Sequence, residues 1–410
     1  MSTTDWILIV YAGVTMAALL MLWGNLLVNL FIFRRPPVVS ASVLGSPAPL
    51  VSVCVPARNE ALRIGNLLRS LAAQDYPDFE VIILNDRSED DTTAVLQAWQ
   101  NDIPRMRVMA GESLPRGWVG KCWACHQLSR EARGHYILFT DADTILHPQC
   151  LSSAVQFAQA HDAALTSLWP RQVAGTWSEK LIIPFVYQLL LVFLPHALVN
   201  RISHAGLGAA NGQFVLFRRS DYDALGGHEA VRNHLVEDVA LARATLAAGR
   251  KLLNVDGTEL VSCRMYHRFA DLWEGFTKNL RAAFEKNAGA FVFFGVLQAT
   301  VLLGAFLSRA DSADHQGRGM AFDAAGHSFA CANCAHLADA RGLCRQVQAI
   351  GSVGICASDR ANAGLGHCAE FMGSNGHRRS QMEGPHLQAG GLRALPVLRI
   401  QSPWEPDHLP

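Results

Sequence analysis

Residues 135–143 read HYILFTDAD, and this stretch decides the fold class. The short apolar run His135–Thr140 is typical of a buried β-strand. It runs directly into Asp141 and Asp143, so the strand ends in two carboxylates. In open α/β sheets, ligands bind beyond the carboxyl ends of the strands. The stretch therefore predicts a central strand with a polar site at its end.

The segments before this strand alternate between strand and helix patterns. The predicted strands are Leu50–Val55 (ended by Pro56), Phe79–Leu84 and Arg107–Ala110. The predicted helices are one capped by Asn59 with Leu62 on its apolar face, then Asp90–Trp99 and Cys122–Arg130. This alternation predicts an α/β fold, a mainly parallel sheet with helices on both faces.

Later segments are less regular. Leu181–Val199 is apolar but contains Pro184 and Pro195, which favours an interfacial or re-entrant helix, with a core helix as the alternative. Gln213–Arg218 is a predicted strand, and Leu235–Ala248 is a predicted helix.

The N-terminal run Trp6–Phe33 carries no charge and is long enough to cross the hydrocarbon core of a bilayer, about 30 Å. Arg34 and Arg35 follow it, so the positive-inside bias places the rest of the chain in the cytoplasm. We predict a transmembrane helix within residues 1–35 and a linker over residues 36–49; a buried core helix is the alternative.

Composition narrows the functional classes. The 410 residues carry 35 basic and 35 acidic side chains, which argues against a nucleic-acid-binding protein. A cytoplasmic location predicts that the ten cysteines are reduced. Cys122 and Cys125 have redox-motif spacing, but packing on one helix turn is the preferred interpretation.

Acidic residues at strand and helix ends are the candidate chemical groups. Asp141 and Asp143, two residues apart in a turn, can converge on Mg²⁺ or Mn²⁺, although many such pairs are solvated turns. Asp86 follows a predicted strand and could accept hydrogen bonds from a nucleotide, or simply cap a helix. Glu237 and Asp238 are predicted at the start of a helix. Their carboxylates could simply stabilise the helix dipole, or one of them could be a general base.

The motifs VSVCVPARNE (51–60), ILNDRSEDDT (83–92), FTDADT (139–144) and VED (236–238) resemble those of family 2 glycosyltransferases with the GT-A fold. The resemblance covers roughly residues 50–285. The segment LPRGWVGKCWA (114–124), with RMY (264–266) and WEG (273–275), is similar to membrane enzymes that glycosylate hopanoids, carotenoids or related lipids.

The resemblance implies roles for individual residues. Ala57, Arg58 and Glu60 would line the nucleotide pocket. Asp86 would contact the nucleobase, and Lys121 would approach the nucleobase or the diphosphate. Asp141 and Asp143 would hold the ribose and the metal, with Asp143 the closer metal ligand. Asp238 would be the general base, beside Glu237, in one inverting displacement. The Gln-x-x-Arg-Trp motif of processive synthases has no match here, so we expect one sugar per acceptor; Trp273 is a candidate acceptor platform or a core residue.

The C-terminal region has a different composition. A second membrane helix is expected over residues 286–307, with a truncated helix as the alternative. Residues 308–410 hold five cysteines, seven histidines and thirteen glycines, with neither Lys nor Tyr. A zinc module is one interpretation; an atypical tail, disordered or translated out of frame, is preferred.

The family resemblance and the N-terminal membrane helix together imply a non-processive hexosyltransferase. It would use a UDP- or GDP-hexose donor and a hydroxylated lipid acceptor. It would act at the cytoplasmic face of a bacterial-type inner membrane. The alternatives are transfer to polyprenyl phosphate, and a non-catalytic membrane scaffold that binds a nucleotide-sugar.

Overall fold

The structure is a computed structural model that describes residues 2–45, 47–103, 105–202, 204–283, 289 and 295. The expected tail (308–410), and all but residues 289 and 295 of the expected second membrane helix (286–307), lie outside the described residues. The domain boundaries drawn from the sequence therefore remain predictions at this end of the chain.

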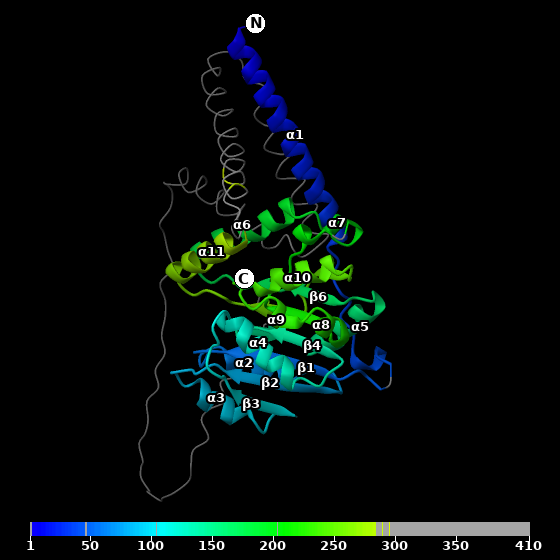
Figure 1. The fold of residues 1–410 in the computed structure, drawn as a ribbon, viewed down its shortest axis with the longest axis vertical. Helices are drawn as coiled ribbons and strands as arrows, with labels where there is room; N and C mark the ends of the chain where they lie inside the picture. Colours follow the sequence, from blue (N-terminus) through cyan, green and yellow to red (C-terminus); the bar gives the residue numbers. More distant parts are fainter. Residues whose placement is uncertain are drawn as a thin grey trace, which may run out of the picture. The chain divides into compact units, whose positions relative to one another are not determined.

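The described residues form a seven-stranded sheet in the order β3-β2-β1-β4-β8-β6-β9 (Figure 1). Its strands are β1 (Val51–Ala57), β2 (Phe79–Asn85), β3 (Met106–Ala110), β4 (Tyr136–Thr140), β6 (Leu165–Trp169), β8 (Phe214–Arg218) and β9 (Leu252–Asp256). The first four strands are parallel, whereas β8 runs antiparallel to both β4 and β6. The α/β fold is confirmed, with a mixed sheet.

Helices cover both faces of this sheet because alternate strand residues point to opposite sides. Val53 and Leu138 face a core shared with α2 (Ile64–Ala72), α3 (Thr92–Trp99) and α5 (Cys150–Ala160). Cys54 and Phe139 face a second core shared with α4 (Gly120–Glu131), α8 (Arg219–Ala224) and α10 (Glu237–Ala247), and α9 (Gly227–Ala230) packs on α4.

A small second sheet lies at the carboxyl end of β4. Its order is β5 (Thr144–Leu146), β10 (Val261–Cys263) and β7 (Arg171–Gln172). Because β5 follows Asp143 directly, this sheet fixes the chain immediately after the two aspartates.

Two local expectations are wrong. Pro56 does not end β1: it pairs with Leu84, beyond the point where pairing with β4 stops at Cys54, so its missing N–H is tolerated. Asn59 does not cap α2, which begins at Ile64; its φ of 56° and its bond from the Glu89 N–H place it in a loop. Leu62 is consequently 96% exposed.

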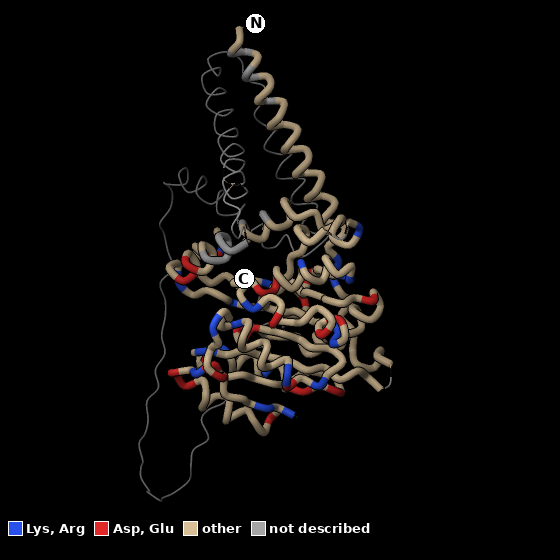
Figure 2. Tube along the Cα trace, in the orientation of Figure 1, with Lys and Arg blue, Asp and Glu red and all other residues tan. Residues whose placement is uncertain are grey.

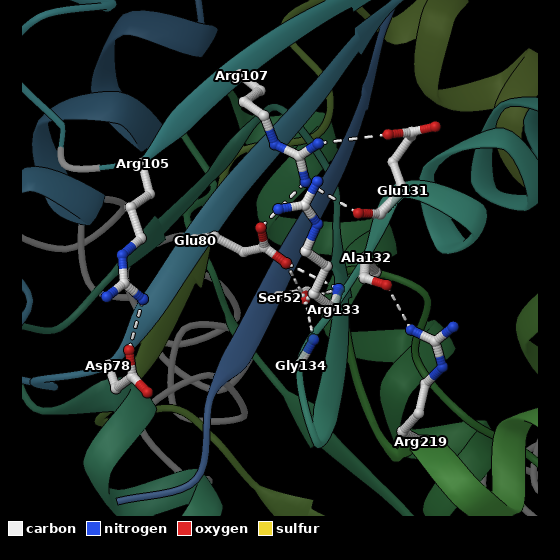
Figure 3. Close-up of polar contacts among 10 residues, drawn as sticks. All are labelled: Ser52, Asp78, Glu80, Arg105, Arg107, Glu131, Ala132, Arg133, Gly134 and Arg219. Atoms are coloured by element: carbon white, nitrogen blue, oxygen red, sulfur yellow. Dashed lines mark hydrogen bonds and ion pairs between the residues drawn. The ribbon is translucent and has the colours of Figure 1, made fainter.

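The opposite end of the sheet is held by a polar network around Glu80 (Figure 3). This buried carboxylate accepts hydrogen bonds from Ser52 Oγ at 2.7 Å, from the Arg133 N–H at 2.8 Å and from Arg107 Nη2 at 3.0 Å. Gly134 is required beside it, since a Cβ there would lie 2.6 Å from the Ser52 nitrogen. The network joins β1, β2, β3 and the entry to β4.

The predicted N-terminal helix is α1 (Thr3–Ile32), and its residues Ile9–Ile32 are long and apolar enough to cross a membrane. Apart from Asp5 near its start, the sequence of α1 has no charged residue, in contrast to the sheet region, where Figure 2 shows many. Beyond it, η1 (Ala41–Val43) lies in the expected linker. After α1, Arg35 forms ion pairs with Asp256 at 2.6 Å and Glu259 at 2.8 Å. The base of α1 is thereby attached to the sheet domain.

Helices α6 (Trp177–Phe193) and α7 (His196–Ile202) contact α1, and α11 (Phe269–Ala283) contacts α6. Another 3-10 turn, η2 (Ala205–Leu207), follows α7. Helices α6 and α7 are bent by 45° at their break. The buried Asn29 of α1 donates to the carbonyls of Leu191 and Leu194, and accepts from the His196 N–H. Asn29 thus satisfies backbone groups that the break leaves without helix partners.

Candidate functional site

The loops after β1 and β2 are joined at the carboxyl end of the sheet. The Asp86 N–H donates to the Ala57 carbonyl at 2.8 Å, and the Glu60 N–H donates to Thr92 Oγ1 at 2.8 Å. Asp86 is largely shielded and lies beside Gly111, where a Cβ would come within 3.0 Å of its Oδ1. Arg58 is exposed in the same loop. The predicted site residues at this edge of the sheet are thus Ala57, Arg58, Glu60 and Asp86.

Lys121, at the start of α4, lies between two carboxylates. Its Nζ is 2.8 Å from Oδ1 of Asp141 and 2.9 Å from Oε1 of Glu237. Asp141 follows β4 and Glu237 begins α10, so one ammonium joins three elements. The same small cavity is lined by Lys121, Asp141, Glu237, Asp238 and Gly212.

Asp238 occupies the other side of this cavity. Its Oδ1 accepts from the Val239 N–H at 2.8 Å, and the backbone of Gly212 also bonds to the carboxylate. A Cβ on Gly212 would lie 2.9 Å from Asp238 Oδ2 and 3.4 Å from Lys121 Nζ. Glycine therefore allows the chain before β8 to approach the carboxylate closely.

The neighbouring carboxylates Glu237 and Asp238 differ in pKa. Burial, and then the charge of Glu237, raise the pKa of Asp238 to about 7. Burial acts in the same sense on Glu237, but the Lys121 ammonium outweighs it and lowers the pKa of Glu237. A group that titrates near neutrality suits a general base, and an ionised neighbour suits ion pairing.

Asp143 lies between the end of β4 and β5. Burial, and then the charge of Asp141, raise its pKa to about 6. Its Oδ1 is buried without a hydrogen-bond partner in the described part of the chain. Burial also raises the pKa of Glu60 to about 7; the Arg63 guanidinium opposes this, while Asp143 and Asp141 add to it. The carboxylates of Glu60, Asp141 and Asp143 thus lie close enough for their charges to raise the pKa of Glu60 and Asp143.

Part of the chain is similar to a known protein family. Residues 52–226 match the family described as glycosyl transferase family 2. This matched part, the family 2 domain, is therefore similar to glycosyl transferase family 2. The curated relatives include 4,4'-diaponeurosporenoate glycosyltransferases of Staphylococcus aureus strains MRSA252 and USA300, each 30% identical over 256 residues. The alignments cover 61% of this chain and 65% of each relative, so the chain spans less than two thirds of their length.

Matches to solved structures were also found. One is a mannosyltransferase from Pyrobaculum calidifontis in complex with GDP-Man and Mn²⁺, with a TM-score of 0.47, 18% identity, and coverage of 85% of this chain and 99% of that one. Another is glucosyl-3-phosphoglycerate synthase from Mycobacterium tuberculosis in complex with Mn²⁺ and UDP-glucose, with a TM-score of 0.40, 18% identity, and coverage of 58% and 78%.

The acidic pair of the family 2 domain has donor atoms that fit a hard divalent cation. Asp143 Oδ1 is buried and has no hydrogen-bond partner in the part of the chain that the structure describes, and Asp141 lies two residues before it in the sequence. Within the described residues no group of three or more His, Cys, Asp or Glu side chains could hold a metal. Mg²⁺ commonly binds one or two carboxylates plus substrate phosphates, which matches this smaller donor set.

Trp273 alone among the predicted site residues lies outside the strand-end loops and the helix starts beside them. It is 63% exposed on α11 and its ring contacts Phe269, so the alternative of a core residue is wrong. Sequence patterns did not reveal the roles of Gly212, which lies against Asp238, or of Cys263 and Gln213, which lie behind Asp143. Their significance depends on strands β8 and β10, whose positions in the sheets no local pattern specifies.

Proposed function

We propose that the chain transfers a hexose from a UDP- or GDP-hexose to a hydroxylated lipid, with inversion at the anomeric carbon. The observation that carries the proposal is the set of groups gathered at the carboxyl edge of the large sheet. A buried carboxylate with a pKa near 7 (Asp238), a lysine (Lys121) and an acidic pair (Asp141 and Asp143) come from separate segments. These are a base, a phosphate-binding cation and metal ligands.

In the proposed reaction, Asp238 accepts the proton of the acceptor hydroxyl. The hydroxyl oxygen forms a bond to the anomeric carbon, and the bond from that carbon to the diphosphate oxygen breaks. The nucleoside diphosphate leaves with the electron pair. Lys121 contributes positive charge near the leaving diphosphate, and Glu237 holds the ammonium in place. A divalent cation held by Asp143 and Asp141, when bound, supplies further charge stabilisation.

A lipid acceptor is supported by exposed apolar side chains on helices α6, α7 and α11, of which α6 and α7 contact α1. Exposed apolar residues on α6, α7 and α11 are Trp177, Leu181, Leu190, Leu198, Ile202, Phe269 and Trp273. Helices α6 and α7 contact α1 near Asn25, Asn29 and Phe33. At 1.5 Å per residue, Asn25, Asn29 and Phe33 span about 12 Å along the proposed cytoplasmic end of α1 and the residue after it. This length matches the depth of a lipid headgroup region and is much shorter than a bilayer core.

This location favours helices that lie at the membrane surface, where Trp and other aromatic side chains are enriched. We place the membrane-facing surface on α6, α7 and α11, and the carboxylate site on the cytoplasmic side of it. The similarity to carotenoid glycosyltransferases supports the same class of acceptor.

The test is nucleoside diphosphate release and lipid glycosylation by the membrane-bound protein, with a panel of nucleotide-sugars, with and without Mn²⁺. We expect metal-dependent turnover with one donor, lost in Asp143→Ala and Asp238→Asn. Asp223→Asn is the matched control, because Asp223 is an exposed carboxylate paired with Arg219 on α8. Nucleotide-sugar binding without turnover of any donor would contradict the proposal and favour a non-catalytic scaffold.

A further inference from the structure

A buried chain of polar side chains leads from Asp143 to helix α6. The Cys263 thiol of β10 donates a hydrogen bond to the Asp143 carboxylate. Gln213 Nε2, just before β8, donates to Cys263 Sγ at 2.9 Å. Gln213 Oε1 in turn accepts from Gln172 Nε2 of β7 at 2.6 Å, and Gln172 bonds to Tyr187 on α6.

The residues of this chain are deeply buried. Cys263 is 1% exposed, Gln213 2% and Gln172 8%. Burying a polar group costs free energy unless it is hydrogen-bonded, so such a set persists only when its members satisfy one another. Gln213 uses both ends of its amide in the contacts described, which fixes the orientation of the side chain.

The arrangement leaves the two oxygens of Asp143 in different environments. One side of the carboxylate receives the Cys263 thiol, whereas Oδ1 is buried with no partner among the described residues. A neutral thiol has a single S–H donor, so it can hold one carboxylate oxygen and leave the other available. Ligating carboxylates are generally oriented by hydrogen bonds of this kind from groups behind them.

We propose that Cys263 and Gln213 are positioning residues that hold Asp143 with Oδ1 directed toward a divalent cation. The inference rests on the proposed function for the identity of the metal site. It adds that a thiol and an amide, neither of them a metal ligand, set the orientation of the ligand. Through Gln172 and Tyr187, the same contacts join this carboxylate to the helix that we place at the membrane surface.

The test measures Mn²⁺ binding to the full-length protein in the absence of any nucleotide-sugar. The electron paramagnetic resonance signal of free Mn²⁺ reports how much of the metal is bound. Asp143→Ala defines the binding that does not involve this site. Cys263→Ala should weaken Mn²⁺ binding at the site about tenfold, the lower end of the range for groups that orient metal ligands. Cys263→Ser, which keeps a donor, should restore affinity to within about threefold of wild type.

Matched controls separate positioning from packing. Cys150 is buried in α5 within the apolar core, so Cys150→Ala should leave Mn²⁺ affinity unchanged even if it lowers the melting temperature. Gln213→Leu removes the donor to Cys263 while keeping a similar volume, and should also weaken Mn²⁺ binding. It provides the measurement if Cys263→Ala fails to fold.

Three results would overturn the inference. They are Mn²⁺ binding equal in wild type and Asp143→Ala, full affinity in both Cys263→Ala and Gln213→Leu, and loss of affinity in Cys263→Ser equal to that in Cys263→Ala. The last would mean that the sulfur itself binds the metal. The binding measurement contains no nucleotide-sugar, so it does not depend on sugar transfer. A protein that binds Mn²⁺ through these residues but transfers no sugar would therefore contradict only the proposed function.

Discussion

Lys121 and Asp141 form an ion pair, with Nζ 2.8 Å from Oδ1, between the start of α4 and the end of β4. The same ammonium is 2.9 Å from Glu237, so it lies among carboxylates at the point where the proposed diphosphate would bind. The pair places positive charge beside the acidic residues instead of leaving the site uniformly negative. A diphosphate bound at this edge, as proposed, would meet the Lys121 ammonium as well as the carboxylates.

Lys121→Met should raise the donor KM about tenfold, the equivalent of about 1.4 kcal/mol of lost phosphate contact. It should also lower the free energy of unfolding by about 1–3 kcal/mol, because Glu237 loses its partner; exposure of the half-buried ammonium keeps the cost toward the lower value. Lys121→Arg is the control that keeps the charge. A donor KM unchanged in Lys121→Met would remove Lys121 from the donor site.

Asp238→Asn should reduce kcat by a factor of about 10²–10⁴ without raising the donor KM, since only proton transfer is lost. Burial and the charge of Glu237 raise the pKa of Asp238 to about 7, and the base form is the one that works. We therefore expect kcat/KM of the wild type to fall as pH drops below about 7 and to level off above it. A profile that is flat from pH 5 to pH 8 would exclude Asp238 as the base.

Gly212→Ala should reduce kcat by at least about tenfold while the protein stays folded. The new Cβ would lie 2.9 Å from Asp238 Oδ2, so the carboxylate must move, and small displacements of a reacting group are costly. Gly65→Ala in α2 is the matched control, since the nearest atom to its new Cβ is 4.0 Å away. Normal turnover in Gly212→Ala would show that the position of Asp238 is not critical.

Glu80→Gln should lower the free energy of unfolding by about 1–3 kcal/mol, because a buried charged acceptor is replaced by a neutral amide. Burial opposes the ionisation of Glu80, but bonds from Ser52, Arg133 and Arg107 hold its pKa below the usual 4.5. A lowered pKa stabilises the fold above the unfolded-state value, and that contribution is lost as pH falls through the folded-state value.

Acid unfolding of the wild type should therefore steepen below about pH 4.5, and Glu80→Gln should flatten this part of the curve. Glu131→Gln is the control: Glu131 contacts the same Arg107 but is 51% exposed, and its loss should change stability by less than about 0.5 kcal/mol. Equal effects of the two substitutions on denaturant midpoints would contradict a special role of Glu80.

Trp273→Ala should raise the KM for a bilayer-embedded acceptor about fivefold, the equivalent of about 1 kcal/mol of aromatic contact. Hydrolysis of the donor by water should be unaffected, because Trp273 lies on α11 and not among the carboxylates. Trp273→Phe keeps an aromatic ring and should show a smaller effect. If donor hydrolysis falls as much as lipid glycosylation, Trp273 acts on the domain as a whole and not on the acceptor.

Local sequence patterns predicted most strands and helices to within a few residues. β2 and α4 differ from their predicted ranges by one or two positions, since buried apolar runs and helix periodicity are local properties. The errors at Pro56 and Asn59 arose where tertiary context overrode a local rule: pairing with one neighbouring strand tolerated the proline, and the loop joined to residues 86–92 held Asn59 out of the helix.

The alternating α/β pattern, the apolar N-terminal helix and the acidic residues at strand ends could be predicted from the amino-acid sequence, because each depends on residues close together in the chain. The structure was needed to show that Lys121 bridges Asp141 and Glu237, that Gly212 lies against Asp238, and that Cys263 and Gln213 lie behind Asp143. These contacts join segments far apart in the chain. Their geometry follows from the order of strands in the sheets, which no single segment encodes.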